Sequence, residues 1–132
     1  MNTRLLMILS AVFTGSLGLG ATFLPQEIIA HFGDNPEVLA VLLVKVAGAL
    51  YLGFAFLNWM ARGNLIGGIY SRPVAMGNFL HFAVVAVVLS KAMMAGSRDL
   101  AVVIGLVAYF AFAVWFGAVL FARPFRVEKG KV

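Results

Sequence analysis

The sequence predicts an all-α integral membrane protein, a four-helix bundle in a single domain of residues 1–132. Three observations support this fold class. Hydrophobic residues make up 63% of the 132 residues and charged residues only 11%, whereas soluble domains are about half apolar and a quarter charged. Four segments are long and apolar enough to cross a bilayer, and the Lys and Arg residues gather near the segment ends. Lipid is therefore the solvent that this composition fits.

Each predicted span reaches the ~20 apolar residues that a hydrocarbon core of about 30 Å requires. The spans cover about residues 3–24, 36–60, 73–94 and 98–122. A cleaved signal peptide is the competing interpretation of the first segment. Because Leu19-Gly20-Ala21 is a poor cleavage site, we expect the segment to remain as a span.

Local signals mark two of the span boundaries. Before the second span, Asp34 or Asn35 can cap the helix, Pro36 suits the first helical position, and Glu37 suits the positive end of the helix dipole. Between the third and fourth spans, the short turn 95–97 predicts two antiparallel neighbouring helices.

The segment after the first span predicts a short helix that lies at the membrane interface. Its apolar and polar residues separate onto two sides at helical spacing. The apolar side holds Ile28, Ile29 and Phe32, and the polar side holds Glu27 and His31, between Pro25 and Gly33.

The distribution of basic residues predicts that both termini are cytoplasmic. Only Lys91 and Arg98 lie near the loops on the opposite side. The other side holds the basic residues of the N-terminus, the middle loop and the C-terminal tail: Arg4, Arg62, Arg72, Arg123, Arg126, Lys129 and Lys131. The positive-inside rule assigns this richer side to the cytoplasm.

Several classes of chemistry find no support in the sequence. There is no cysteine, and no nucleophile elbow, P-loop or dinucleotide fingerprint occurs. The two histidines, His31 and His81, fall on different sides of the bilayer in the predicted topology, and no carboxylate lies in the interior of a span, away from its ends. The net charge of +5 is not gathered into a basic stripe. We therefore predict no catalytic residue, no metal site and no nucleic-acid partner.

Pairs of small residues four apart predict close helix–helix contacts, because helices in lipid associate through backbone approach at small residues. These pairs are Ala11/Gly15, Ser16/Gly20, Ala49/Gly53 and Ala113/Gly117. They do not distinguish contacts within the chain from contacts in an oligomer. Tyr51 and Asn58, seven residues apart, form a further polar face, and together with Gly53 and Gly117 they are the predicted partner interface.

Two basic residues, Lys45 and His81, lie in the interior of the predicted spans, away from their ends. A charge at the bilayer centre costs about 2.5–3.5 kcal/mol. Lys45 lies eight residues after Glu37, and His81 lies eight residues after Pro73. Helical spacing places Lys45 on one stripe with Ala49, Leu52, Phe56 and Trp59. If the polar stripes face inward, they enclose a pocket lined by Lys45, His81, Asn78, Tyr109 and Thr14.

Each of these two residues also has a simpler interpretation. Lys45 can extend its ammonium toward the lipid headgroups along its apolar stem. His81 can be a neutral imidazole that forms a hydrogen bond with Asn78, a hydroxyl or a carbonyl. The sequence leaves both interpretations open.

Phe23-Leu24-Pro25 and the segment Gly48-Ala49-Leu50-Tyr51-Leu52-Gly53 resemble small four-helix bacterial membrane proteins of the DoxX-like group. Those proteins also place an interfacial segment after the first helix and a similar Gly-Ala-Leu-Tyr-Leu-Gly sequence in the second. The resemblance implies a multi-pass protein of the bacterial inner membrane. Some members of the wider group are membrane subunits of quinone-linked oxidoreductases, and the absence of cysteine here argues against direct thiol chemistry.

These observations favour a small non-enzymatic membrane protein that acts as a subunit or accessory of a larger membrane complex or of a homo-oligomer. The alternative is a protein that binds or transports a small hydrophobic or anionic ligand near Lys45 and His81. No cofactor is predicted apart from the lipid or quinone of that alternative.

Overall fold

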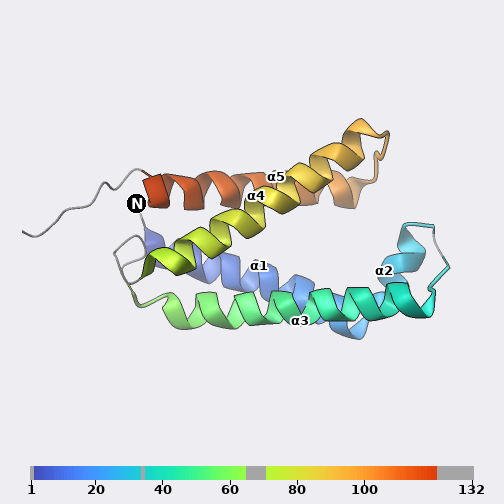
Figure 1. Ribbon diagram of the computed structural model, residues 1–132, viewed down its shortest axis with the longest axis horizontal. Coiled ribbons are helices and arrows are strands. Elements are labelled where there is room, and N and C mark those ends of the chain that lie inside the picture. Colours follow the sequence, from blue (N-terminus) through green and yellow to red (C-terminus); the bar gives the residue numbers. More distant parts are fainter. Residues whose placement is uncertain (1, 34, 65–70, 122–132) are drawn as a thin grey trace, which may run out of the picture. The chain divides into compact units, whose positions relative to one another are not determined.

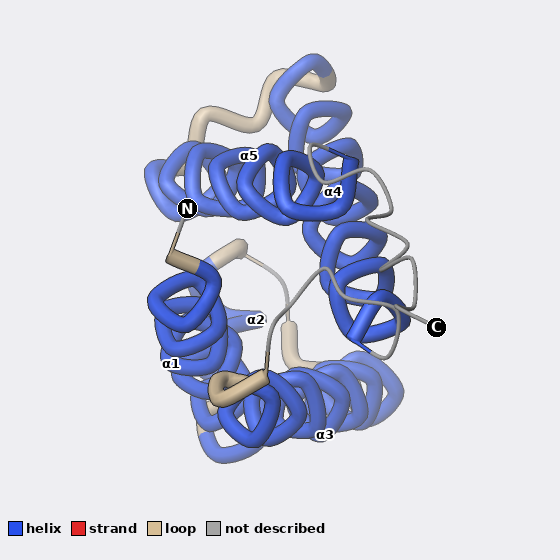
Figure 2. The backbone as a smooth tube through the Cα atoms, turned by 90° about the vertical axis from the view of Figure 1, so that its left-hand side faces the viewer, coloured by secondary structure: helices blue, strands red, loops and turns tan. Residues whose placement is uncertain are grey.

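The computed structural model describes residues 2–33, 35–64 and 71–121, and these residues form five helices and no strand (Figures 1 and 2). The helices are α1 (Thr3–Phe23), α2 (Pro25–His31), α3 (Val38–Ala61), α4 (Arg72–Met94) and α5 (Leu100–Phe121). The prediction of an all-helical chain is confirmed for the described residues. The four long helices agree with the predicted spans to within a few residues.

The chain divides into two compact units. One unit runs from Met7 to Arg62 and contains most of α1 together with α2 and α3. The other contains α4 and α5, with the first residues of the chain up to Leu6. The expectation of a single domain stays a prediction.

Helix α1 begins and ends where its flanking residues predict. The Asn2 Oδ1 accepts a hydrogen bond from the Leu5 backbone N–H (3.1 Å), which satisfies one of the free donors at the helix start. After Phe23, Leu24 leaves the helical conformation and Pro25 becomes the first residue of α2. Proline suits that position because its missing N–H is not needed there.

Helix α2 confirms the short helix predicted after the first span. It ends at His31, and two residues later Gly33, which has a φ of +85°, donates its N–H to the Ala30 carbonyl (3.1 Å). Ile29 is buried, whereas Phe32 is exposed and lies just beyond the helix. Of the three residues on the predicted apolar side, Ile29 is therefore buried and Ile28 half-buried, whereas Phe32 is not covered.

Helix α3 begins two residues later than predicted, at Val38 rather than Pro36. The Glu37 N–H donates to the Asn35 carbonyl (2.8 Å), so Pro36 is the centre of a three-residue turn instead of the first helical residue. Glu37 is the N-cap and makes no side-chain capping bond. The predicted cap at Asn35 is therefore wrong, and the alternative cap, Asp34, lies outside the described residues.

The turn between α4 and α5 is a Schellman motif followed by a capped helix. Gly96, with a φ of +103°, donates to the Met93 carbonyl (3.0 Å), and the Ser97 N–H donates to the Ala92 carbonyl (3.1 Å). The Asp99 Oδ1 then accepts from the Ala101 N–H (2.7 Å) at the start of α5. These local bonds produce the antiparallel hairpin that the short turn predicts.

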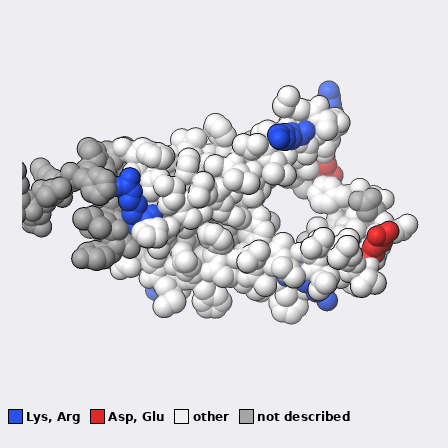
Figure 3. Space-filling model, in the orientation of Figure 1, with Lys and Arg blue, Asp and Glu red and all other residues white. Residues whose placement is uncertain are grey.

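Helices α1, α3, α4 and α5 are each long and apolar enough to cross a membrane. Large apolar side chains are exposed along all four; examples are Val12, Leu50, Val84 and Phe110. Figure 3 shows a face on which uncharged side chains cover most of the surface. Water would not tolerate so much exposed apolar surface, and these helices indicate a multi-pass membrane protein.

Candidate functional site

Helices α1 and α3 approach most closely at two glycines. A Cβ atom on Gly48 would lie 2.5 Å from the Thr22 Oγ1, 2.9 Å from the Thr22 backbone N and 3.0 Å from the Gly18 carbonyl oxygen. A Cβ atom on Gly18 would lie 2.9 Å from the Leu52 backbone N. No real side chain fits at such distances, so the two glycines allow the backbones to meet.

The same two helices run antiparallel and share a buried polar cluster. The Asn58 Nδ2 donates to the Ser10 Oγ (3.1 Å), and the Ser10 hydroxyl donates to the Met7 carbonyl (3.1 Å). The Thr14 hydroxyl donates to the Ser10 carbonyl (2.8 Å). Ser10, Thr14 and Asn58 are fully buried. In an apolar solvent such bonds hold helices together, because an unsatisfied polar group would be costly.

Lys45 does not join this cluster. Gly15 faces Ala55 on α3, and Lys45 lies ten residues from Ala55, about 15 Å along the helix at 1.5 Å per residue. The Lys45 side chain is exposed. Its stripe is exposed as well: Ala49, Phe56 and Trp59 are exposed and Leu52 is half-buried. That this stripe faces a protein interior stays a prediction.

His81 and Tyr109 meet inside the α4–α5 hairpin. Their ring centroids are 5.9 Å apart, and the Phe82 ring lies 5.2 Å from His81 and 5.6 Å from Tyr109. His81 is half-buried and Tyr109 is buried. Asn78 lies one turn before His81, is fully buried, and donates its Nδ2 to the Val74 carbonyl (2.9 Å). The hairpin thus places three of the five predicted pocket residues on neighbouring turns.

The remaining two predicted pocket residues, Lys45 and Thr14, belong to the other compact unit. A pocket that includes Lys45 and His81 stays a prediction.

The residues of the predicted partner interface have different environments. Asn58 is buried and bonded to Ser10, so it serves the contact between α1 and α3. A Cβ atom on Gly117 would lie 3.1 Å from the Phe79 ring, so Gly117 serves the α4–α5 contact. Tyr51 is half-buried, and Gly53 is exposed with no atom within 4 Å of its Cβ position. Of the four, Gly53 has the most open surroundings.

The predicted small-residue pairs give a mixed result. Ala11 is buried and Gly15 lies against Ala55 (3.4 Å). Gly20 and Gly53 have open surroundings, so the pairs Ser16/Gly20 and Ala49/Gly53 make no close contact in the described part of the chain. The closest approach uses Gly18 and Gly48, which the small-residue search missed. One signal could have found the first of them: Thr22 follows Gly18 at four residues and donates its hydroxyl to the Gly18 carbonyl (2.7 Å).

Among the described residues, no three His, Asp or Glu side chains come together in a way that could hold a metal ion. Thr14, Asn78 and Ser90 donate side-chain hydrogen bonds to carbonyls of their own helices, and Asn58 donates to a side chain of a neighbouring helix. This arrangement stabilises helix packing.

No protein-family model, no curated protein and no solved structure matches this chain.

Proposed function

We propose that this chain is a small non-enzymatic subunit of a membrane assembly, a homo-oligomer or a larger complex, and that α3 is its main contact helix. The observation that carries this proposal is how few residues of α3 are buried. Of the 24 residues of α3, all described, only Gly48, Asn58 and Ala61 are buried. A helix that is apolar on all sides and so little covered offers an extensive surface to another helix.

One side of α3 has the spacing that a partner helix requires. Five exposed apolar residues recur at steps of four, three, four and seven, which is the heptad pattern of left-handed helix pairs. At 100° per residue they fall within about 60° of one another. We call them the leucine seam: Leu39, Leu43, Val46, Leu50 and Leu57, with exposures between 42% and 66%.

The proposal includes an orientation and a location. Basic residues favour cytoplasmic termini, and the DoxX-like resemblance favours the bacterial inner membrane. The four basic residues of the C-terminal tail lie outside the described residues.

At the C-terminal end of α3, Arg62 lies over the Trp59 ring (4.1 Å). Trp and Arg are typical anchors at a membrane interface, which fits α3 ending there. Helix α2 would then lie at the opposite interface.

The test is the mass of the protein after gentle extraction. We expect wild-type protein in a mild detergent to run as a homo-oligomer or with a stoichiometric partner chain, measured by light scattering and native mass spectrometry. Replacing Leu43 and Leu50 with Trp should dissociate it, because bulky rings on the seam prevent close packing. Leu80→Trp, at an exposed α4 position (52%), is the matched control and should leave the mass unchanged. A wild-type protein that is monomeric and carries no partner chain would contradict the proposal.

A further inference from the structure

Lys45 is a cation on the exposed surface of an apolar helix. It lies seven residues after Val38, the first residue of α3, so its Cα is about 10 Å from the helix start at 1.5 Å per residue. Side chains on a helix lean toward the N-terminus. The Lys45 ammonium is therefore directed to the nearer end of α3, toward the lipid headgroups at that end.

The long helices of this chain offer Lys45 no counter-charge. Helices α1, α3, α4 and α5 contain no Asp or Glu. A cation at this depth is stabilised by an anion, and the anion has to come from outside these helices. The lean of the side chain favours the phosphate layer of the near leaflet over a carboxylate placed deeper in a partner helix.

On the side of Lys45 that faces the middle of α3, the exposed helix surface carries small residues. Ala49 and Gly53 follow at four and eight residues, about 6 and 12 Å deeper along the helix. Both are exposed, and the Gly53 Cβ position has no atom within 4 Å. Larger exposed side chains, Val46 and Phe56, flank this track. An acyl chain that extends from a headgroup at Lys45 toward the membrane centre would run along these small residues.

We propose that Lys45, Ala49 and Gly53 form a binding site for one phospholipid of the leaflet at the N-terminal end of α3. The phosphodiester pairs with the Lys45 ammonium, and one acyl chain lies over Ala49 and Gly53. The site is an exposed helix face and does not involve His81. It borders the leucine seam at Val46, and lipid binding there does not require the assembly proposed above.

The experiment measures lipid retention by native mass spectrometry. Delipidated protein in a mild detergent is titrated with phosphatidylethanolamine, with phosphatidylglycerol, and with diacylglycerol of the same acyl chains. We expect one tightly retained phospholipid on the wild type and none with diacylglycerol. Lys45→Met should weaken retention about tenfold or more, which is the effect of losing one charge-assisted hydrogen bond. Lys45→Arg should preserve it.

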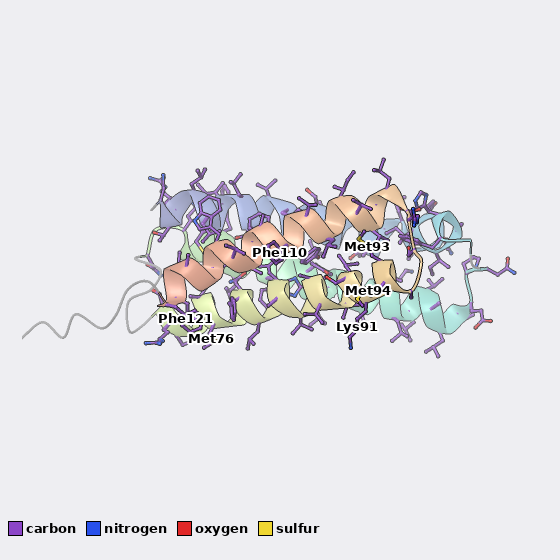
Figure 4. All side chains as sticks on the ribbon, turned by 90° about the horizontal axis from the view of Figure 1, so that it is seen from above. Met76, Lys91, Met93, Met94, Phe110 and Phe121 are labelled. Carbon is purple, nitrogen blue, oxygen red and sulfur yellow. The ribbon has the colours of Figure 1, made fainter. Side chains whose placement is uncertain are left out.

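Two matched controls separate this site from general lipid contact. Lys91 is also exposed, near the end of α4 (Figure 4), but Val87 lies on its inward side and its side chain leans away from the nearer helix end. Lys91→Met should therefore have no effect. Gly53→Leu should weaken retention by filling the track. Gly20→Leu, at a half-buried glycine of α1 whose Cβ position is also free, should not.

Three results would overturn the proposal: unchanged retention in Lys45→Met, equal retention of diacylglycerol, or equal losses in the Lys91 and Gly20 controls. Loss of a partner chain without loss of lipid in Lys45→Met would also overturn it, in favour of a protein carboxylate. The oligomeric mass, read in the same spectra, reports on the assembly separately.

Discussion

Gly48 and Gly18 show how single residues determine the packing of this protein. Lipid provides no hydrophobic driving force between helices, so contact distance decides how much attraction they gain. The glycine contact brings α1 and α3 together in the register that also pairs Ser10 with Asn58 (3.1 Å). Close packing and the polar bond thus depend on the same alignment.

We expect Gly48→Ala to lower the free energy of unfolding by about 1–3 kcal/mol, the usual cost of overpacking. The added Cβ would meet backbone atoms of Thr22 and Gly18, which cannot rotate away. Unfolding in mixed micelles of mild detergent and SDS, followed by tryptophan fluorescence, measures the change. Gly20→Ala is the control: its Cβ position is open, and higher helix propensity should raise stability by up to about 1 kcal/mol. Similar effects at both glycines would show that the contact is not tight.

At the scale of elements, the α4–α5 hairpin is held by stacked aromatic rings. Phe82 is fully buried, and its ring stacks on Phe112 (4.8 Å) and Phe116 (5.6 Å). Nearer the open end of the hairpin, Phe79 meets Phe121 edge to face (5.7 Å). Aromatic pairs of this geometry contribute about 0.5–1.5 kcal/mol each beyond area burial. The hairpin is therefore a well-packed unit.

Phe82→Ala should destabilise the protein by about 3–5 kcal/mol, because it removes a buried ring and leaves a cavity. Phe110, on the outer side of α5 (Figure 4), is 62% exposed and serves as the matched control. Phe110→Ala should change stability by less than about 0.5 kcal/mol, as surface substitutions do. The same micelle titration compares the two variants. If Phe110→Ala were the more damaging change, the stacked cluster would not be what holds the hairpin.

At the scale of the whole molecule, the charge distribution along the chain predicts its orientation. The α4–α5 turn should face away from the cytoplasm and the end of α3 should face it, because a single span, α4, separates them. The chain contains no cysteine, so single-cysteine variants report topology without background.

We expect Ser97→Cys to react with a membrane-impermeant maleimide in intact spheroplasts, and Asn64→Cys to react only after permeabilisation. Gel-shift of the labelled protein measures both. The reverse pattern would invert the topology, and labelling of both in intact spheroplasts would mean that α4 does not cross the membrane.

Much of the architecture follows from the sequence because it depends on local chemistry. Apolar length predicts four spans, Pro25 and Gly33 bound α2, and Gly96 and Asp99 shape the α4–α5 turn. One boundary failed for a local reason as well, since Pro36 forms a turn before α3 instead of starting it.

The sequence by itself thus determined that the chain is helical, where its helices lie, and that lipid suits them. Only the tertiary structure decided which side of each helix is used. Because α3 is apolar on all sides, it has no amphipathic stripe that could show its buried face. The contact between Gly18 and Gly48 determines which face of α3 is buried. Asn58, which the sequence predicts in a partner interface, is therefore buried against Ser10. The same contact leaves Lys45 on an exposed side of α3.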